Sequence, residues 1–247
     1  MKTIAILNHK GGTGKTTSAL NIGAGLARQK KKTLLIDIDP QTNLTEGLGI
    51  RDVKTSIYNS IRDGIDLPIQ RINDYLDLVP SSLELVGAEL ELVSRLAREN
   101  ILKNLIKKLK TQYDYIIIDC PPALGMLTIN ALVPADTVLI QLEAEYYAYR
   151  GIDRMVSIIS DVRTHYNEKL TIGGVFITKC NPKRLLTEHI TESVHKHFGD
   201  KLLTSKIRVN VALAEAPIQG KDIFEYAPTS NGAVDYGNLV EEILTKI

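Results

Sequence analysis

One short segment near the start of the chain combines glycine, lysine and threonine in a spacing suited to binding phosphate. Residues 10–17 read Lys-Gly-Gly-Thr-Gly-Lys-Thr-Thr and follow an apolar run from Thr3 to Asn8. Glycines let successive backbone N–H groups point at phosphate oxygens, and the N-terminus of a following helix adds partial positive charge. In this loop Lys15 would neutralise the terminal phosphates and the Thr16 hydroxyl would bind Mg²⁺. The segment therefore predicts a site for a nucleoside triphosphate.

The loop departs from the strict phosphate-loop pattern at its first position. That pattern, Walker A, has Gly, four residues, Gly, Lys and then Ser or Thr. A strict match would put glycine at residue 9, where this chain has His9. The alternative interpretation, a glycine-rich turn with solvated lysines, is disfavoured because a strand precedes the loop and a helix follows it. We therefore interpret the loop as a deviant Walker A motif.

Aspartates follow two other apolar runs. Asp39 comes soon after the run from Thr33 to Asp37, and the run from Tyr115 to Asp119 ends in aspartate itself. The carboxyl ends of parallel strands meet at one edge of a sheet, so carboxylates there can lie beside a phosphate loop and hold Mg²⁺, usually through water. We expect Asp119 to hold the metal, and Asp39 to lie near it and orient the attacking water. Asp37 is more ambiguous and could support the metal shell.

Strand-like and helix-like segments alternate along the chain. The expected strands are Thr3–Asn8, Thr33–Asp37, Leu76–Val79, Tyr115–Asp119, Thr137–Leu142 and Ile172–Thr178, and the expected helices are Thr16–Gln29, Leu83–Lys110, Gly151–Tyr166, Thr187–Phe198 and Ala233–Ile247. The pattern weakens over 44–75, where only short helices or turns are expected. Such alternation predicts an α/β fold, with a mostly parallel twisted sheet flanked by helices on both faces. We expect a single domain over residues 1–247.

Composition limits the function classes. The chain is 44% hydrophobic and 24% charged, which is typical of a soluble globular domain. Its net charge is +1, so binding to nucleic acid or membrane would need a local basic patch. Cys120 and Cys180 are too few for a disulfide framework. With no signal peptide and no long apolar run, a cytoplasmic protein is expected.

The loop resembles the deviant Walker A motif of the ParA/Soj/MinD ATPases, in which an additional lysine, here Lys10, begins the motif. Thr13 stands where that family usually has Val, while 34–41 and 113–122 resemble its two carboxylate motifs. The resemblance implies that Lys10 crosses a dimer interface to the phosphates of the partner's ATP. It therefore predicts a homodimer around ATP and Mg²⁺, with catalytic roles for Lys10, Lys15 and Asp39.

The resemblance extends over nearly the whole chain. The segment from Asn210 to Pro217 resembles the loop that closes over adenine, and Asn181 stands where the family uses an Asn side chain for the base. Asn181 could instead belong to a turn that ends the strand before Pro182. The implied nucleotide contacts are Lys10, Gly11, Gly12, Thr13, Gly14, Lys15, Thr16, Thr17, Asn181 and Pro217, and the implied metal-site residues are Thr16, Asp39 and Asp119.

Other branches of this superfamily are disfavoured. Iron proteins need cluster-binding thiolates, whereas Cys120 and Cys180 both lie inside nucleotide-side motifs. MinD-type proteins end in a basic membrane helix, but the segment 239–247 is short and acidic. Tyrosine kinases carry a terminal tyrosine cluster, and no tyrosine follows Tyr236. The DNA-partition branch remains, with no membrane partner expected.

The window 179–210 could carry DNA contacts. It holds seven Lys and Arg residues against three Asp and Glu, a net +4, which exceeds the charge of the whole chain. Such a patch could grip phosphates without reading bases. The alternative is a solvated helix face, and Ala212 stands where the family commonly has an arginine implicated in DNA contact. The candidate contacts are Lys183, Arg184, Lys206 and Arg208.

The expected function is that of a ParA/Soj-like ATPase that segregates a chromosome or plasmid. It would dimerise around ATP, bind DNA non-specifically on the nucleoid, and hydrolyse ATP faster with a ParB-like centromere-binding partner. Two alternatives remain open. One is an ATPase that positions a protein or membrane cargo, and the other is a non-enzymatic DNA-binding module that nucleotide stabilises.

Overall fold

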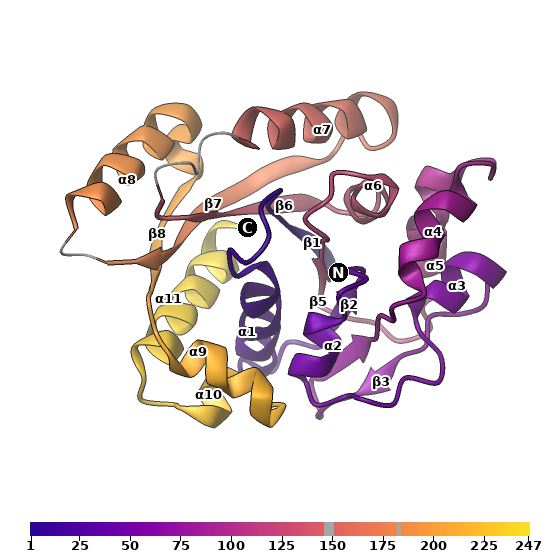
Figure 1. Cartoon of the computed structure of the whole chain (residues 1–247), viewed down its shortest axis with the longest axis horizontal. Coiled ribbons are helices and arrows are strands. Elements are labelled where there is room, and N and C mark those ends of the chain that lie inside the picture. The colour runs from indigo at the N-terminus through magenta and orange to yellow at the C-terminus, as the bar shows by residue number, and fades with distance from the viewer. Residues whose placement is uncertain (146–150, 182–183) are drawn as a thin grey trace.

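The computed structural model describes residues 1–145, 151–181 and 184–247. Its eight described strands form one sheet in the order β3-β4-β2-β5-β1-β6-β7-β8 (Figure 1). The strands are β1 (Lys2–Leu7), β2 (Thr33–Asp37), β3 (Gln70–Arg71), β4 (Leu76–Val79), β5 (Tyr115–Asp119), β6 (Thr137–Glu143), β7 (Thr171–Cys180) and β8 (Leu202–Arg208). All pairs are parallel except β3 with β4, so the expected α/β fold with a mostly parallel sheet is confirmed.

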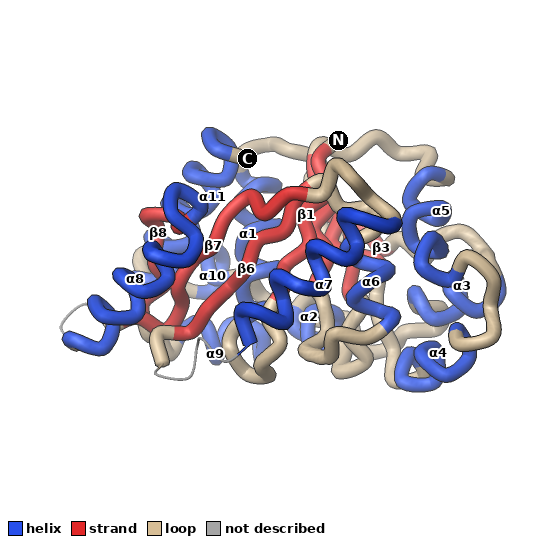
Figure 2. Tube along the Cα trace, turned by 90° about the horizontal axis from the view of Figure 1, so that it is seen from above, coloured by secondary structure: helices blue, strands red, loops and turns tan. Residues whose placement is uncertain are grey.

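Helices cover both faces of this sheet. They are α1 (Lys15–Arg28), α2 (Asn43–Gly47), α3 (Ile57–Asp63), α4 (Leu85–Leu92), α5 (Ile101–Lys107), α6 (Met126–Leu132), α7 (Ile152–His165), α8 (Leu185–Phe198), α9 (Ala212–Glu215), α10 (Ile223–Tyr226) and α11 (Asn231–Lys246), with 3₁₀ turns at Arg98–Asn100, Gly199–Lys201 and Ala216–Gln219. Figure 2 shows α7 and α8 lying across the strands. Among the described helices, none is both long and apolar enough to span a bilayer.

Alternation along the strands explains the two cores. Ile4 and Ile6 of β1 belong to the core under α1 and α11, whereas Ala5 and Leu7 belong to the core under α4 to α8. Successive side chains of a strand point to opposite faces, so a strand covered on both faces must be apolar throughout. The continuous apolar run of β1 follows from this burial.

The register brings the functional segments to one edge. Asp119 of β5 pairs with Asp37 of β2 on one side and with Ile6 of β1 on the other. One residue after Ile6, β1 ends and the chain enters the phosphate loop. Both carboxylate motifs therefore meet that loop at the carboxyl end of the sheet.

Two local expectations needed correction. The segment from Leu83 to Lys110 is not one helix, because Ala97 adopts a left-handed backbone at φ 52° between α4 and α5. Strand β8 was not expected, because its sequence Leu-Leu-Thr-Ser-Lys-Ile-Arg mixes polar and apolar residues. That mixture suits the edge of a sheet, where one side is open to solvent.

Candidate nucleotide site

Glycine is required in the phosphate loop by the backbone itself. Gly12 has φ 73° and Gly14, which caps the N-terminus of α1, has φ 100°. Side chains other than glycine rarely adopt such left-handed conformations. The loop thereby turns from β1 into α1 within a few residues, with the N-terminus of the helix facing the space above the loop.

Hydrogen bonds from β6, from β7 and from Lys15 of α1 hold the carbonyl groups of the loop. The carbonyl of Thr13 accepts bonds from Gln141 Nε2 at 2.7 Å and from Thr178 Oγ1 at 3.0 Å. The carbonyl of Lys10 accepts a bond from Lys15 Nζ at 3.2 Å. Because a trans peptide points its C=O and the next N–H in opposite directions, a carbonyl held from behind turns the following N–H toward the loop's open side. Gln141 and Thr178 were not expected from sequence.

Lys15 lies inside the site. It is only 6% exposed. Burial lowers its pKa, while the nearby carboxylates of Asp119 and Asp39 act in the opposite direction. Burying an ammonium group costs free energy unless anions surround it, so the burial of Lys15 indicates a site for anionic ligands.

Asp119 fits a magnesium site. Its side chain is fully buried, and neither carboxylate oxygen has a hydrogen-bond partner in the part of the chain that the structure describes. Burial raises its pKa well above the ordinary value, and Asp37 adds to this rise, while Thr16 and Lys15 oppose it. An unpartnered buried carboxylate close to a threonine hydroxyl is a donor set suited to a hard cation.

The other ligands of such a cation must come from elsewhere. Within the described residues, no group of three or more His, Cys, Asp or Glu side chains is arranged to hold a metal ion. Mg²⁺ commonly keeps waters and uses one or two carboxylates together with substrate phosphates. Thr16 and Asp119 therefore fit Mg²⁺ that arrives with a nucleotide.

Asp37 and Asp39 have different environments. Asp37 is fully buried and accepts bonds from the amides of Asp39, at 3.1 Å, and Thr45, at 2.9 Å. Burial raises its pKa to about 7. Asp39 lines the cavity described below, and its Oδ1 accepts the amide of Gln41 at 3.0 Å. The carboxylate of Asp37 is thus used in hydrogen bonds to the backbone that follows β2, whereas Asp39 faces the ligand space.

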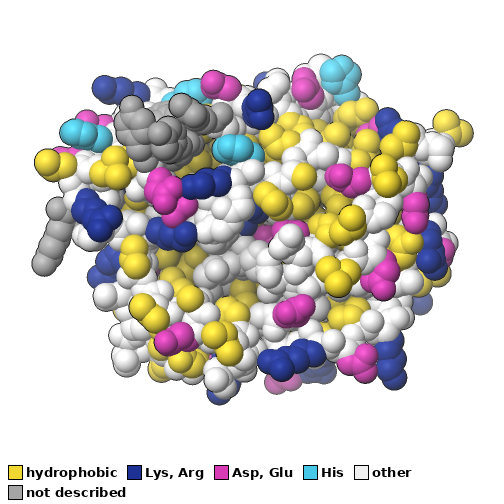
Figure 3. Space-filling view, in the orientation of Figure 1, with side chains coloured by type: hydrophobic (Ala, Val, Ile, Leu, Met, Phe, Trp, Pro, Cys, Tyr) yellow, Lys and Arg dark blue, Asp and Glu magenta, His cyan; other side chains and the backbone are white. Residues whose placement is uncertain are grey.

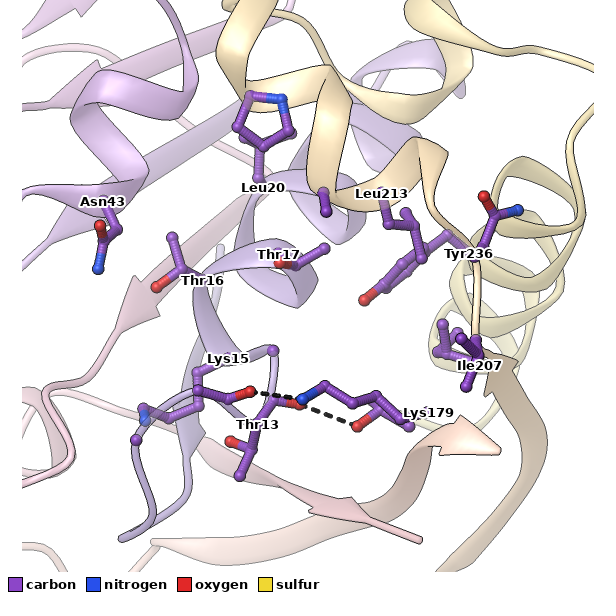
Figure 4. Close-up of a pocket in the computed structure, with 18 of the residues that line it drawn as sticks. Thr13, Lys15, Thr16, Thr17, Leu20, Asn43, Lys179, Ile207, Leu213 and Tyr236 are labelled. Atoms are coloured by element: carbon purple, nitrogen blue, oxygen red, sulfur yellow. Dashed lines mark hydrogen bonds between the residues drawn. The ribbon is translucent and has the colours of Figure 1, made fainter. Parts of the chain in front are cut away.

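A cavity of about 620 Å³ opens above the phosphate loop. Figure 4 shows Lys15 and Thr16 on one side and Leu213 and Tyr236 on the other. Residues 11–17, Asn210 and Pro217, which the sequence places at the nucleotide, line it, but Asn181, although described, is not among its lining residues. Leu213, which lies in the expected adenine loop, forms an apolar wall of the cavity together with Leu20, Ile207 and Tyr236, which the sequence did not indicate.

Lys10 lies on the rim of this cavity rather than inside it. Its side chain is 45% exposed, and its Nζ lies 2.5 Å from Glu145 and 3.5 Å from Glu143. The hydrogen bond to Glu145 is the largest cause of its raised pKa. The two lysines of the motif therefore differ: Lys15 faces the chain's own ligand space, and Lys10 is exposed at the surface.

Comparisons with known proteins identify the family to which this chain belongs. A family model described as an AAA domain matches residues 1–172. The Sporulation initiation inhibitor protein Soj of Bacillus subtilis (strain 168) is 45% identical over 247 residues, covering 98% of each chain. The chain belongs to the ParA/Soj family of partitioning ATPases. The Chromosome-partitioning ATPase Soj of Treponema pallidum (strain Nichols) is 40% identical, over 99% of this chain and 98% of that protein.

Solved structures of this ParA/Soj fold include nucleotide complexes. A putative plasmid partition protein from Borrelia burgdorferi B31 bound to AMPPNP has a TM-score of 0.84 at 28% identity, over 100% of this chain and 99% of that one. Cobyrinic acid a,c-diamide synthase from Mycobacterium smegmatis, with bound ATP analogue and magnesium, has a TM-score of 0.87 at 30% identity, over 99% and 94%. The same fold therefore holds a nucleotide in both proteins.

The candidate DNA contacts of this ParA/Soj chain are not equally available. Arg208 binds Asp235, with its Nη2 2.6 Å from Oδ1, while Lys206 Nζ donates to Thr191 Oγ1 at 3.0 Å. Arg184 is exposed at the start of α8, and Lys183 lies outside the described residues. On the face that Figure 3 shows, Lys and Arg side chains are interspersed with acidic ones. The charge of Arg208 is thus already neutralised within the chain.

Proposed function

We propose that this chain is a partition ATPase that binds ATP with Mg²⁺, dimerises face to face around the nucleotide, binds DNA without sequence preference, and is stimulated by a ParB-like partner. The observation that carries the proposal is the pair of lysines in one loop: Lys15 is buried in the ligand space and Lys10 is exposed on its rim. A monomeric nucleotide site would need only the first of them.

ATP and Mg²⁺ are supported by the chemistry of the site. Loop amides and Lys15 would bind the phosphates. The apolar wall, which includes Leu213, would hold the base together with Pro217. Thr16 and Asp119 would hold the metal, which supplies charge neutralisation at the phosphates when bound. The sequence predicts that Asn181 contacts the base, and we propose this contact for the nucleotide-bound state.

Asp39 is the residue proposed to position the attacking water. It lines the cavity two residues after β2, the strand whose last residue pairs with Asp119 of β5. Burial raises its pKa, while the amide of Gln41 and the charge of Lys15 lower it. A carboxylate in this position can orient a water for in-line attack, and Lys15 stabilises the charge that develops.

The dimer is proposed from Lys10. Its ammonium lies outside the cavity and is held by carboxylates of its own chain. A second copy facing this rim would bring the phosphates of its ATP within reach of Lys10. Charge-assisted bonds to phosphate are stronger than an exposed ion pair, so Lys10 would bind those phosphates in preference to the carboxylates of its own chain. Dimerisation would then depend on the nucleotide, which makes the ATPase a switch.

DNA binding and partner stimulation rest on family likeness and on the basic residues Arg184 and Lys206. The ion pair between Arg208 and Asp235 reduces the charge available to DNA. That observation favours a second candidate, an ATPase that positions a protein cargo instead of DNA. For the first candidate, the protein would work in the cytoplasm on the nucleoid.

One experiment tests the main proposal. Sedimentation and retention on long duplex DNA are measured without nucleotide, with ADP, with ATP and with a slowly hydrolysed ATP analogue. We expect a dimer and DNA retention only with ATP or its analogue. A monomer in all four states would contradict the sandwich, and an ATP-dependent dimer without DNA retention at low salt would favour the protein-cargo candidate.

A further inference from the structure

Lys179 occupies an irregular point of the sheet next to the phosphate loop. The pairing of β7 with β8 shifts register between Ile177 and Cys180, and Lys179 itself has a left-handed φ of 51°. Such irregularities re-aim a side chain out of the normal alternation. The five residues before it on β7 are buried, but Lys179 is exposed and reaches toward the loop from the opposite wall of the cavity (Figure 4).

The ammonium of Lys179 joins two groups. It donates to the carbonyl of Gly12 at 2.8 Å, and it lies 2.9 Å from Glu143 Oε1. Glu143 is the last residue of β6, and its side chain is only 9% exposed. Lys179 therefore anchors both the phosphate loop and a nearly buried carboxylate.

Glu143 is shared by two lysines. Its Oε1 faces Lys179, and its Oε2 lies 3.5 Å from Lys10. Of the two, Lys179 is the nearer. A nearly buried carboxylate left without a cation is strongly unfavourable, so the chain needs at least one of these lysines to stay with Glu143.

The second carboxylate near Lys10 does not impose the same demand. The side chain of Glu145 is 52% exposed, and water can solvate it when its partner leaves. Exposed ion pairs contribute little to stability. Glu143, rather than Glu145, therefore decides whether Lys10 can leave its own chain without cost.

We propose that Lys179 is a positioning residue for Lys10: as the resident counter-ion of Glu143, it allows Lys10 to leave that carboxylate and reach the phosphates of a partner's ATP. The inference rests on the proposed sandwich dimer. Without Lys179, Lys10 becomes the sole neighbour able to neutralise Glu143 among the ion pairs of the described residues, and it is retained on its own chain.

The test compares ATP-driven dimerisation with nucleotide binding by the single subunit. Lys179→Met should raise the dimer dissociation constant with ATP analogue at least about tenfold, which is within the coupling expected between contacting charged groups. Its affinity for ADP, measured in the same variant, reports how much of the effect comes from the lost bond to the Gly12 carbonyl, and the weakening of the dimer should exceed the weakening of ADP binding. Lys179→Arg should keep the wild-type behaviour, and Lys169→Met, at an exposed lysine elsewhere, is the matched control.

A second variant separates positioning from a general loosening of the loop. Replacing Glu143 by Gln in the Lys179→Met background removes the carboxylate that retains Lys10, so dimerisation should return toward the wild-type constant. Lys179→Met protein that dimerises like the wild type would overturn the inference, and so would a double variant that stays as weak as Lys179→Met. A wild-type protein that never dimerises with ATP would instead refute the proposed function and remove the premise of the inference.

Discussion

The carboxylate of Asp37 and the residue Thr45 are joined by two hydrogen bonds. Oδ2 accepts the amide of Thr45 at 2.9 Å and its hydroxyl at 2.6 Å. The same hydroxyl accepts the amide of Ser81 at 2.9 Å, and the Ser81 hydroxyl donates to the carbonyl of Asp39 at 2.8 Å. The loop that carries Asp39 is therefore fixed to the ends of β2 and β4. Asp37 acts as the buried anchor of that loop.

Thr45→Val should loosen this loop. The substitution preserves shape but removes the hydroxyl, which leaves the buried amide of Ser81 without its acceptor. We expect the free energy of unfolding to fall by about 1–3 kcal/mol, the cost of an unsatisfied buried polar group. Urea unfolding measures it, and Thr45→Ser, which keeps the hydroxyl, should lose less. An unchanged unfolding midpoint for Thr45→Val would show that the bonds are not needed.

Lys10→Ala and Lys15→Ala should separate dimerisation of the protein from nucleotide binding by the single subunit. Lys15→Ala should weaken binding of a fluorescent ATP analogue roughly a hundredfold or more, because it loses charge-assisted bonds to the phosphates. Lys10→Ala should bind the analogue nearly normally and sediment as a monomer with ATP. A Lys10→Ala protein that forms a stable, active dimer would contradict the assignment of this lysine to the partner's phosphates.

Asp39→Ala should uncouple binding from hydrolysis. The side chain lines the cavity but is not needed for the anchoring bonds around Asp37, since Ser81 binds the carbonyl of Asp39. We expect a hydrolysis rate lower by roughly a hundredfold or more, with ATP affinity retained and the ATP-bound dimer accumulating. Phosphate release in single turnover measures the rate. Turnover at the wild-type rate would refute the role of Asp39 and assign the water to another group, such as one from the partner.

Local patterns were sufficient to predict the phosphate loop and the strands beside it. The loop residues are contiguous, and the apolar runs of β1, β2 and β5 are buried on both faces, so both signals are local. The meeting of Asp37 with Asp119 could also be anticipated, because parallel strands end at one edge. Fold class and loop thus followed from short-range chemistry.

Features assembled from distant segments were not predictable in this way. Tyr236 reaches the cavity from α11 and bonds Ser18 of α1 at 2.9 Å, a contact that no sequence spacing reveals. From the sequence Asp37 was ambiguous and could support the metal shell; in the structure its carboxylate accepts two bonds from Thr45. Lys179 and Arg208 were both counted as surface charge, although one binds Gly12 and the other Asp235. The partners of Tyr236, Lys179 and Arg208 lie at least 27 residues away in the sequence.

Binding of ATP with Mg²⁺ should become tighter as pH rises through the raised pKa of Asp119. Burial raises this pKa well above its ordinary value, so the nucleotide-free protein keeps a proton on Asp119 to a higher pH than an exposed aspartate would. A metal requires the ionised carboxylate, so binding must expel that proton, and its affinity grows as pH increases. Titration calorimetry at pH 6 to 8 should show net proton release. Asp119→Asn should bind more weakly and lose this part of the pH dependence, whereas an identical pH profile in the variant would exclude Asp119 as the source.

DNA retention should depend on Arg184 and Lys206 more than on Arg208. Arg208 is already paired with Asp235, so its reversal would place two acidic groups together and disturb β8 rather than test DNA. We therefore choose Arg184→Glu with Lys206→Glu, and Lys107→Glu with Lys110→Glu as a charge-matched control on exposed residues near α5.

The two double variants should behave differently on long duplex DNA with ATP. Non-specific binding releases counterions, so the wild-type affinity should fall steeply with salt, and each lost phosphate contact should reduce the slope of log affinity against log salt by about 1. Because two weak sites gain from being joined in one dimer, the loss should exceed that expected for a single subunit. The Arg184 and Lys206 variant should lose retention while still sedimenting as a dimer with ATP, and the control should keep both. Equal retention by the two variants would locate the DNA contacts on another surface, and no retention by the wild type at low salt would favour a protein cargo.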